Sequence, residues 1–147
     1  MMSCSRAAGS SGRRDPGAYK RGGLASRLRD CFDAGVDARS EYVDTNAQAW
    51  RDTPYAGVQW KKLRHDPDSG ASAVLLRFAP GAAYGAHRHP EGEQYYVIEG
   101  SLTDGAETWG AGSYVWHPPG SVHTPRSEQG CLLFVSLPAP IEILGEA

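Results

Sequence analysis

The sequence of 147 residues has few cysteines and no long apolar segment. Its three cysteines, Cys4, Cys31 and Cys131, form no CxxC pair, and an odd, widely spaced set fits a reducing cytosol better than a disulfide framework. No apolar run approaches the roughly 18 residues that a membrane-spanning helix needs, and the N-terminal arginines are not joined to the apolar stretch of a secretory signal. We therefore expect a cytoplasmic protein without a membrane span.

Positive charge is scarce in most of the chain. Residues 1–40 carry eight Lys or Arg against four Asp, a net charge of +4, whereas residues 41–147 carry seven Lys or Arg against thirteen Asp or Glu, a net charge of −6. Because an acidic domain repels the phosphate backbone, we expect no nucleic-acid partner.

Residues 1–40 lack the short β-like runs of the rest of the chain and are predicted to be an N-terminal extension. Residues 1–23 are rich in Ser, Gly and Arg without an apolar period, which predicts disorder. A weak helical stripe follows at i, i+4, i+7 and i+8, made by Leu24, Leu28, Cys31 and Phe32. We therefore expect a disordered or partly helical extension, followed by one domain over residues 41–147.

That domain consists of short β-like runs separated by turn residues. Strands are predicted at residues 58–60, 74–78, 94–98, 114–116 and 131–137, and turns at residues 66–70, 80–81, 99–100 and 118–120. No helical period lies between these runs, which predicts an all-β sandwich or barrel of the size of a small jelly roll.

One cluster of metal-ligand residues falls between two glycines. The sequence reads Gly81, five residues, His87, one, His89, three, Glu93, six, Gly100. His87 and His89 are two residues apart, so on a strand both imidazoles point to the same face. A hairpin over the intervening Pro-Glu-Gly can bring Glu93 back beside them. Imidazole and carboxylate together suit Zn, Fe, Mn, Ni or Co as divalent ions.

A second cluster lies downstream at hairpin distance. It reads Gly112, five residues, Pro118, one, Gly120, two, His123, and the tight turn directs His123 as the strand resumes. The segment between Gly100 and Gly112 has room for one tight connection.

These two clusters resemble the two signature motifs of the cupin superfamily. Residues 109–125, with Gly130-Cys131 after them, resemble the ChrR-like subgroup, and the likeness covers roughly residues 42–140. It implies a cupin jelly-roll β-barrel. It also implies one divalent metal ion held by the two histidines and the glutamate of the first motif and the histidine of the second: His87, His89, Glu93 and His123. Ser127 stands where the second motif usually has Asn, which is not a ligand.

The subgroup implies two candidate functions. It includes small Fe(II) dioxygenases that act on diketones and hydroxyacetophenones, and zinc-binding cupin domains of anti-sigma factors. The first hypothesis is a non-haem Fe(II)-type dioxygenase that cleaves a diketone or hydroxyaryl ketone, with two open metal positions. The alternative is a Zn(II)-binding sensor or regulator without catalysis. The expected partners are a small-molecule substrate or effector and, through edge strands, a second copy in a homodimer.

Two aromatic residues are predicted to line a pocket at the metal. Tyr95 shares strand parity with Glu93, and Trp116 precedes the second motif. His65 is interpreted as a solvated loop residue, and His117 lies outside the ligand pattern. Arg88 and Glu91 are expected to be exposed, and Cys131 to be a buried small apolar residue.

Overall fold

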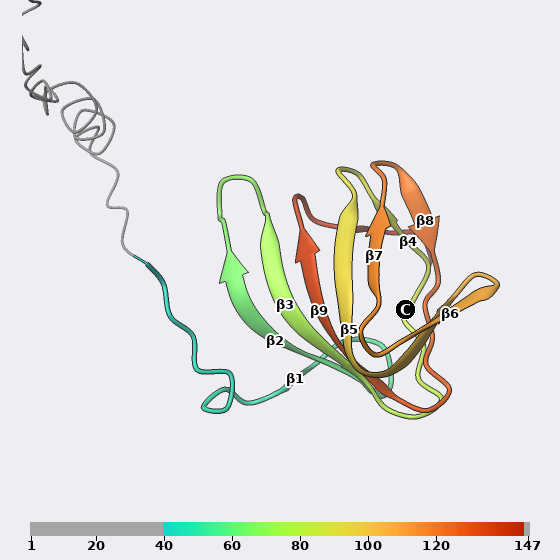
Figure 1. The fold of residues 1–147 in the computed structure, drawn as a ribbon. Helices are drawn as coiled ribbons and strands as arrows, with labels where there is room; N and C mark the ends of the chain where they lie inside the picture. The colour runs from blue at the N-terminus through green and yellow to red at the C-terminus, as the bar shows by residue number, and fades with distance from the viewer. Residues whose placement is uncertain (1–39, 146–147) are drawn as a thin grey trace, which may run out of the picture. The chain divides into compact units, whose positions relative to one another are not determined.

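The computed structural model describes residues 40–145, which fold into antiparallel strands joined by loops (Figure 1). The strands are β1 Arg51–Asp52, β2 Val58–His65, β3 Ser72–Phe78, β4 His87–His89, β5 Glu93–Asp104, β6 Glu107–Gly110, β7 Tyr114–His117, β8 Ser121–His123, β9 Cys131–Leu137 and β10 Glu142–Ile143. The helical stripe and the disorder that we predict before residue 40 lie outside the described residues.

The strands form two sheets. The larger has seven strands in the order β1-β2-β3-β9-β5-β6, with β7 also paired to β5, and the smaller has the order β10-β4-β8. In Figure 1, β2, β3, β9 and β5 run side by side, while β4 and β8 lie beyond β7. Every pairing is antiparallel, which confirms the all-β prediction.

The predicted barrel is not closed by hydrogen bonds among the described residues. The strands of the small sheet have only two or three residues each, too few to pair along the long strands of the other sheet. Outside the named strands, the isolated bridges are Ala83 with Arg126 and Thr103 with Arg126. The arrangement is therefore two antiparallel sheets, which agrees with the predicted jelly roll but does not form a closed barrel.

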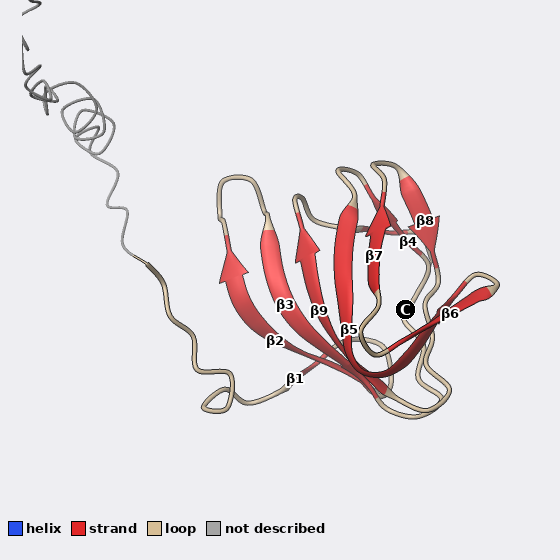
Figure 2. Ribbon diagram, viewed as in Figure 1, coloured by secondary structure: helices blue, strands red, loops and turns tan. Residues whose placement is uncertain are grey.

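Figure 2 shows strands and loops throughout the described part of the chain. These residues contain no helix that is long and apolar enough to cross a membrane.

The core covers one face of the large sheet. Alternate residues of β5 and β9 point to this face and pair directly, Tyr95 with Val135 and Val97 with Leu133. The buried core residues are Val58, Phe78, Ala82, Tyr95, Val97, Leu102, Cys131, Leu133 and Val135. The burial of Cys131 agrees with its interpretation as a small apolar residue.

The predicted strands are found, but β5 is longer than its sequence pattern indicates. We expected it to end at the turn of residues 99–100, whereas it continues to Asp104. The register with β9 shifts between Val97 and Glu99, and a β-bulge of this kind bends a strand without ending it. Gly100 follows the bulge with φ +70°. The sequence signal read as a turn is therefore a bend within one strand.

Gly100 also lies against the backbone at the start of β9. A Cβ at this position would overlap the carbonyl oxygen of Gly130, whereas a Cβ at Gly105 would have open space around it. Both glycines have positive φ, +70° at Gly100 and +60° at Gly105. The two positions therefore share the backbone strain and differ in the steric overlap.

We expect Gly100→Ala to lower the free energy of unfolding by more than about 3 kcal/mol and Gly105→Ala by about 1 kcal/mol. The first adds overlap with backbone atoms to the strain of a positive φ, and the second adds the strain alone. Urea unfolding of the two variants and the parent measures the difference. Equal losses would mean that the approach of the two strands is not tight.

Candidate metal centre

The small sheet places three histidines together. His87 and His89 occupy the first and last positions of β4, both buried, with the exposed Arg88 between them. This is the alternation that their spacing predicts. β8 pairs with β4 in a register that sets His123 directly opposite His87.

Glu93 reaches the same place through the turn between β4 and β5. Gly92 in this turn has φ +86°, and a Cβ there would lie 2.7 Å from the carbonyl oxygen of His117, so only glycine allows the chain to reverse so tightly. The amides of Gly92 and Gly120 both donate to the carbonyl oxygen of His89, at 3.3 and 2.7 Å. Glu93, the first residue of β5, is thereby held beside β4.

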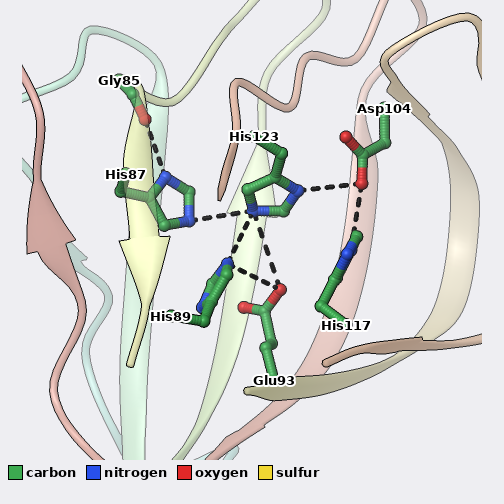
Figure 3. A network of polar contacts seen from close by, with 7 residues as sticks. All are labelled: Gly85, His87, His89, Glu93, Asp104, His117 and His123. Carbon is green, nitrogen blue, oxygen red and sulfur yellow. Dashed lines mark hydrogen bonds and ion pairs between the residues drawn. The ribbon is translucent and has the colours of Figure 1, made fainter. Parts of the chain in front are cut away.

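The four side chains converge on one point, as Figure 3 shows. His123 Nε2 lies 2.9 Å from His87 Nε2 and 3.0 Å from His89 Nε2. Glu93 Oε2 lies 3.5 Å from His89 Nε2 and 3.7 Å from His123 Nε2. One ligand atom from each of the four residues lies within 4.8 Å of the others, which is the spacing of atoms around a single ion.

Hydrogen bonds on the far sides of two rings fix which nitrogens carry protons. His87 Nδ1 donates to the carbonyl oxygen of Gly85 at 2.7 Å, and His123 Nδ1 donates to Asp104 Oδ2 at 2.8 Å. In neutral imidazoles the two Nε2 atoms are therefore unprotonated, and their lone pairs face each other. Two acceptors this close repel unless a metal ion or a proton lies between them.

A buried oxygen supports the same conclusion. Glu93 Oε2 is inaccessible to solvent and accepts no hydrogen bond among the described residues, although buried acceptors are normally satisfied. Three imidazoles and a carboxylate are a donor set for a divalent transition metal. The residues present therefore fit one such ion.

Burial keeps His87 and His89 neutral. It lowers the pKa of His87 to about 4 and that of His89 to about 3, and the neighbouring imidazoles add to the effect. Burial also raises the pKa of Glu93 to about 7, against the attraction of His123 and His117. The site thus offers histidines ready to bind a metal and a carboxyl group that must first lose its proton.

Asp104 and His117 complete the polar cluster, and the sequence analysis missed both roles. Asp104 Oδ2 lies 3.0 Å from His117 Nε2 as well as 2.8 Å from His123 Nδ1. The contact with His117 is an ion pair when that ring is protonated. Burial opposes the ionisation of Asp104, but the two histidines outweigh it and its pKa lies well below the usual range. The close contact with Asp104 raises the pKa of His117.

The candidate metal ligands form part of the wall of a cavity of about 260 Å³. His87, Glu93 and His123 lie in this wall. Most of the remaining lining is apolar and comes largely from β3 and β9, with Val74, Leu76, Phe78, Leu133, Val135 and Leu137 among its members. The cavity therefore joins a polar wall of candidate metal ligands to a mostly apolar surface.

The two predicted pocket residues lie on opposite faces of the large sheet. Tyr95 is buried and lines the cavity. Trp116 is 59% exposed and does not line it, because alternation along β7 turns Val115 and His117 inward and Trp116 outward. Its nearness to the second motif along the chain was therefore misleading.

The remaining expectations concern residues outside the ligand set. Glu91 is exposed as expected. His65 is exposed too, but it is the last residue of β2 and not a loop residue.

Comparisons with known proteins agree with this geometry. The ChrR Cupin-like domain family matches residues 38–139. None of the curated proteins matches the sequence.

Several solved structures share the fold. A provisionally assigned acetylacetone dioxygenase from Methylibium petroleiphilum is 20% identical, with 73% of this chain and 82% of that chain covered and a TM-score of 0.69. An acetylacetone dioxygenase from Acinetobacter johnsonii is 17% identical, with 74% and 80% covered and a TM-score of 0.68. The complex of SigE with the anti-sigma factor ChrR from Rhodobacter sphaeroides is 27% identical, with 85% and 71% covered and a TM-score of 0.57.

Removing a ligand should empty the site. We expect His87→Ala or His123→Ala to lower the metal content well below one ion per chain, since each removes one of four donors from a buried pocket. The exposed His65 provides the control, and His65→Ala should keep the parent's metal content. Elemental analysis of protein prepared without a histidine tag measures it; full occupancy in both ligand variants would rule out this site.

The raised pKa of Glu93 predicts how metal affinity depends on pH. Below about pH 7 the metal-free carboxyl group holds a proton that a metal must displace, so affinity rises with pH up to that point. Glu93→Gln removes this proton. The slope of log affinity against pH between 5 and 7 should therefore fall by about one relative to the parent. Calorimetry in buffers of different ionisation enthalpy counts the protons released; an unchanged count would show that Glu93 is already ionised.

Proposed function

This chain belongs to the ChrR Cupin-like domain family, and we propose that it is a non-haem Fe(II)-type dioxygenase that cleaves a small diketone or hydroxyaryl ketone. The observation that carries this proposal is the apolar cavity of about 260 Å³ whose wall includes three of the four metal ligands. A site that only held a metal would need no such space beside it.

The size and lining of the cavity fit this class of substrate. Its volume of about 260 Å³ lies below the roughly 300–1,000 Å³ of pockets for drug-sized ligands, so the substrate is small. Apolar side chains of β3 and β9 suit its hydrocarbon part, while its oxygen atoms face the ligand wall. When bound, the metal would supply a Lewis acid able to hold the substrate oxygens and dioxygen together.

The protein's own residues prepare this site in three ways. An imidazole that binds a metal through its lone pair adds no charge, so the single carboxylate of Glu93 would leave a bound divalent ion with a net charge of about +1, which suits an enolate. The apolar walls exclude water, which strengthens electrostatic interactions inside the cavity. Tyr84 packs edge-on against His87, with ring centroids 5.1 Å apart, and restricts the orientation of that ligand.

The structural neighbours support this proposal through the similarity of their fold. Two of them carry the name acetylacetone dioxygenase and cover about three quarters of this chain, 73% and 74%. At 20% and 17% identity, these two structures are evidence for the fold only. Dioxygenase chemistry in this chain is supported instead by the cavity beside the candidate ligands.

A zinc-binding sensor or regulator without catalysis is the second candidate. It is favoured by the 27% identity to the ChrR complex and by the number of ligands, because four protein donors saturate a tetrahedral Zn(II) ion. In that case the cavity would hold an effector or remain empty. Metal identity and reactivity with oxygen separate the two candidates.

For the dioxygenase we expect the Fe(II)-loaded protein to change its absorption spectrum when acetylacetone is added without oxygen. It should then consume O₂ when air is admitted. A panel of β-diketones and hydroxyacetophenones extends the test to the whole substrate class. Stoichiometric zinc in the purified protein, with neither signal from the iron form, would favour the sensor.

A variant that fills the cavity tests whether the substrate binds there. Val135 lines the cavity, whereas Ile98 is 40% exposed on the outward face of the neighbouring β5. We expect Val135→Phe to keep the metal but to lose most of the spectral change and the O₂ consumption. Ile98→Phe adds the same ring outside and should retain both. Undiminished activity in Val135→Phe would place the substrate elsewhere.

A further inference from the structure

Asp104 reaches the metal centre from the far end of the strand that supplies Glu93. The two residues are the last and first of β5, and a straight strand would separate them by roughly 36 Å at about 3.3 Å per residue. β5 instead curves, as Figure 1 shows, and its register with β9 shifts between Val97 and Glu99. One strand therefore approaches the site twice.

At the site, a single oxygen of Asp104 contacts two imidazoles on the side away from the ligand cluster (Figure 3). His123 Nδ1 donates to Asp104 Oδ2 at 2.8 Å, and His117 Nε2 lies 3.0 Å from the same oxygen. The Asp104 side chain is only 10% exposed, so little water competes for it. Burying a charged carboxylate costs free energy unless neighbouring groups pair with it and donate hydrogen bonds to it.

We propose that Asp104 is a positioning residue that fixes His123 as a metal ligand, and that His117 holds Asp104 in place. With its proton kept on Nδ1, His123 presents an unprotonated Nε2 toward His87 and His89. The carboxylate also restricts rotation of the ring and makes Nε2 a stronger donor. This role concerns metal binding itself and holds whether the domain is an enzyme or a sensor.

A different use of the same atoms would be a second cation site. Asp104, His117 and His123 also bring their ligand atoms within 4.8 Å of one another. The distance of 2.8 Å between His123 Nδ1 and Asp104 Oδ2 is that of a direct hydrogen bond and leaves no room for an ion between them. The structure therefore favours the positioning role, and metal stoichiometry tests the choice.

The decisive variant is Asp104→Asn, which keeps the shape and removes the charge. An amide oxygen accepts more weakly than a carboxylate, and a rotated amide would donate to Nδ1 and move the ring proton to Nε2. We expect zinc affinity, measured by competition with a chelator, to fall by about 10- to 100-fold. Glu107→Gln removes an exposed carboxylate from the same hairpin and should leave the affinity unchanged.

Two further readouts separate positioning from a general loss of stability. In the zinc-loaded parent, nitrogen-15 NMR of the histidines should show His123 with a proton on Nδ1 and the metal on Nε2, and Asp104→Asn should shift this Nδ1–H signal. The melting temperature of the metal-free protein should change little. Parent-like affinity in Asp104→Asn, an equal drop in Glu107→Gln, or two zinc ions per parent chain would overturn the proposal.

Variants of His117 provide an independent test if Asp104→Asn does not fold. We expect His117→Phe to weaken zinc binding by about 3- to 10-fold and His117→Gln, which retains an N–H donor, to restore much of it. In a folded Asp104→Asn background, His117→Phe should cause no further loss, because the residue acts through Asp104. Full affinity in His117→Phe would contradict its part in the proposal.

Discussion

The Nε2 atoms of His87 and His123 face each other at 2.9 Å, and the rest of the candidate metal centre is arranged around that contact. His87 and His123 each donate their Nδ1 proton outward, so 2.9 Å separates two lone pairs. Such a pair is stable around a metal ion or a shared proton, and Glu93 supplies the one carboxylate among the four candidate ligands. The β4–β8 pairing, the turn at Gly92 and the burial of the rings all maintain this arrangement.

Because β5 is curved, both of its ends reach the candidate metal centre. Its first residue enters the ligand cluster, and its last residue holds a ligand from behind. Between them, Tyr95 and Val97 belong to the core. A straight strand of this length could supply one of these functions but not both, so the bulge and Gly100 have a role beyond packing.

His123 separates two environments with different chemistry. Its Nε2 faces the ligand cluster, beside a cavity lined mostly by apolar side chains. Its Nδ1 faces Asp104, where a buried carboxylate also contacts His117. The apolar side suits a small substrate or effector, and the polar side sets the orientation and donor strength of the ligand. Changes on the two sides should therefore affect ligand binding and metal binding separately.

Local patterns in the sequence were sufficient for much of this description. Strand alternation put His87 and His89 on one face, turn residues marked most strand ends, and motif spacing singled out Glu93 and His123. These features depend on neighbours along the chain, as do strand periodicity and hairpin geometry.

The tertiary structure alone decided the rest. Asp104 and His117 carried no local signal, because their contacts join positions 13 to 19 residues apart through a bend that resembled a turn. Trp116 was misplaced for the converse reason: it is close to the motif along the chain but lies on the opposite face of its strand. The sequence by itself therefore determined the four candidate ligands and the strands that carry them. The second approach of β5, the open arrangement of the two sheets and the apolar cavity follow from long-range packing, which no short stretch of sequence encodes.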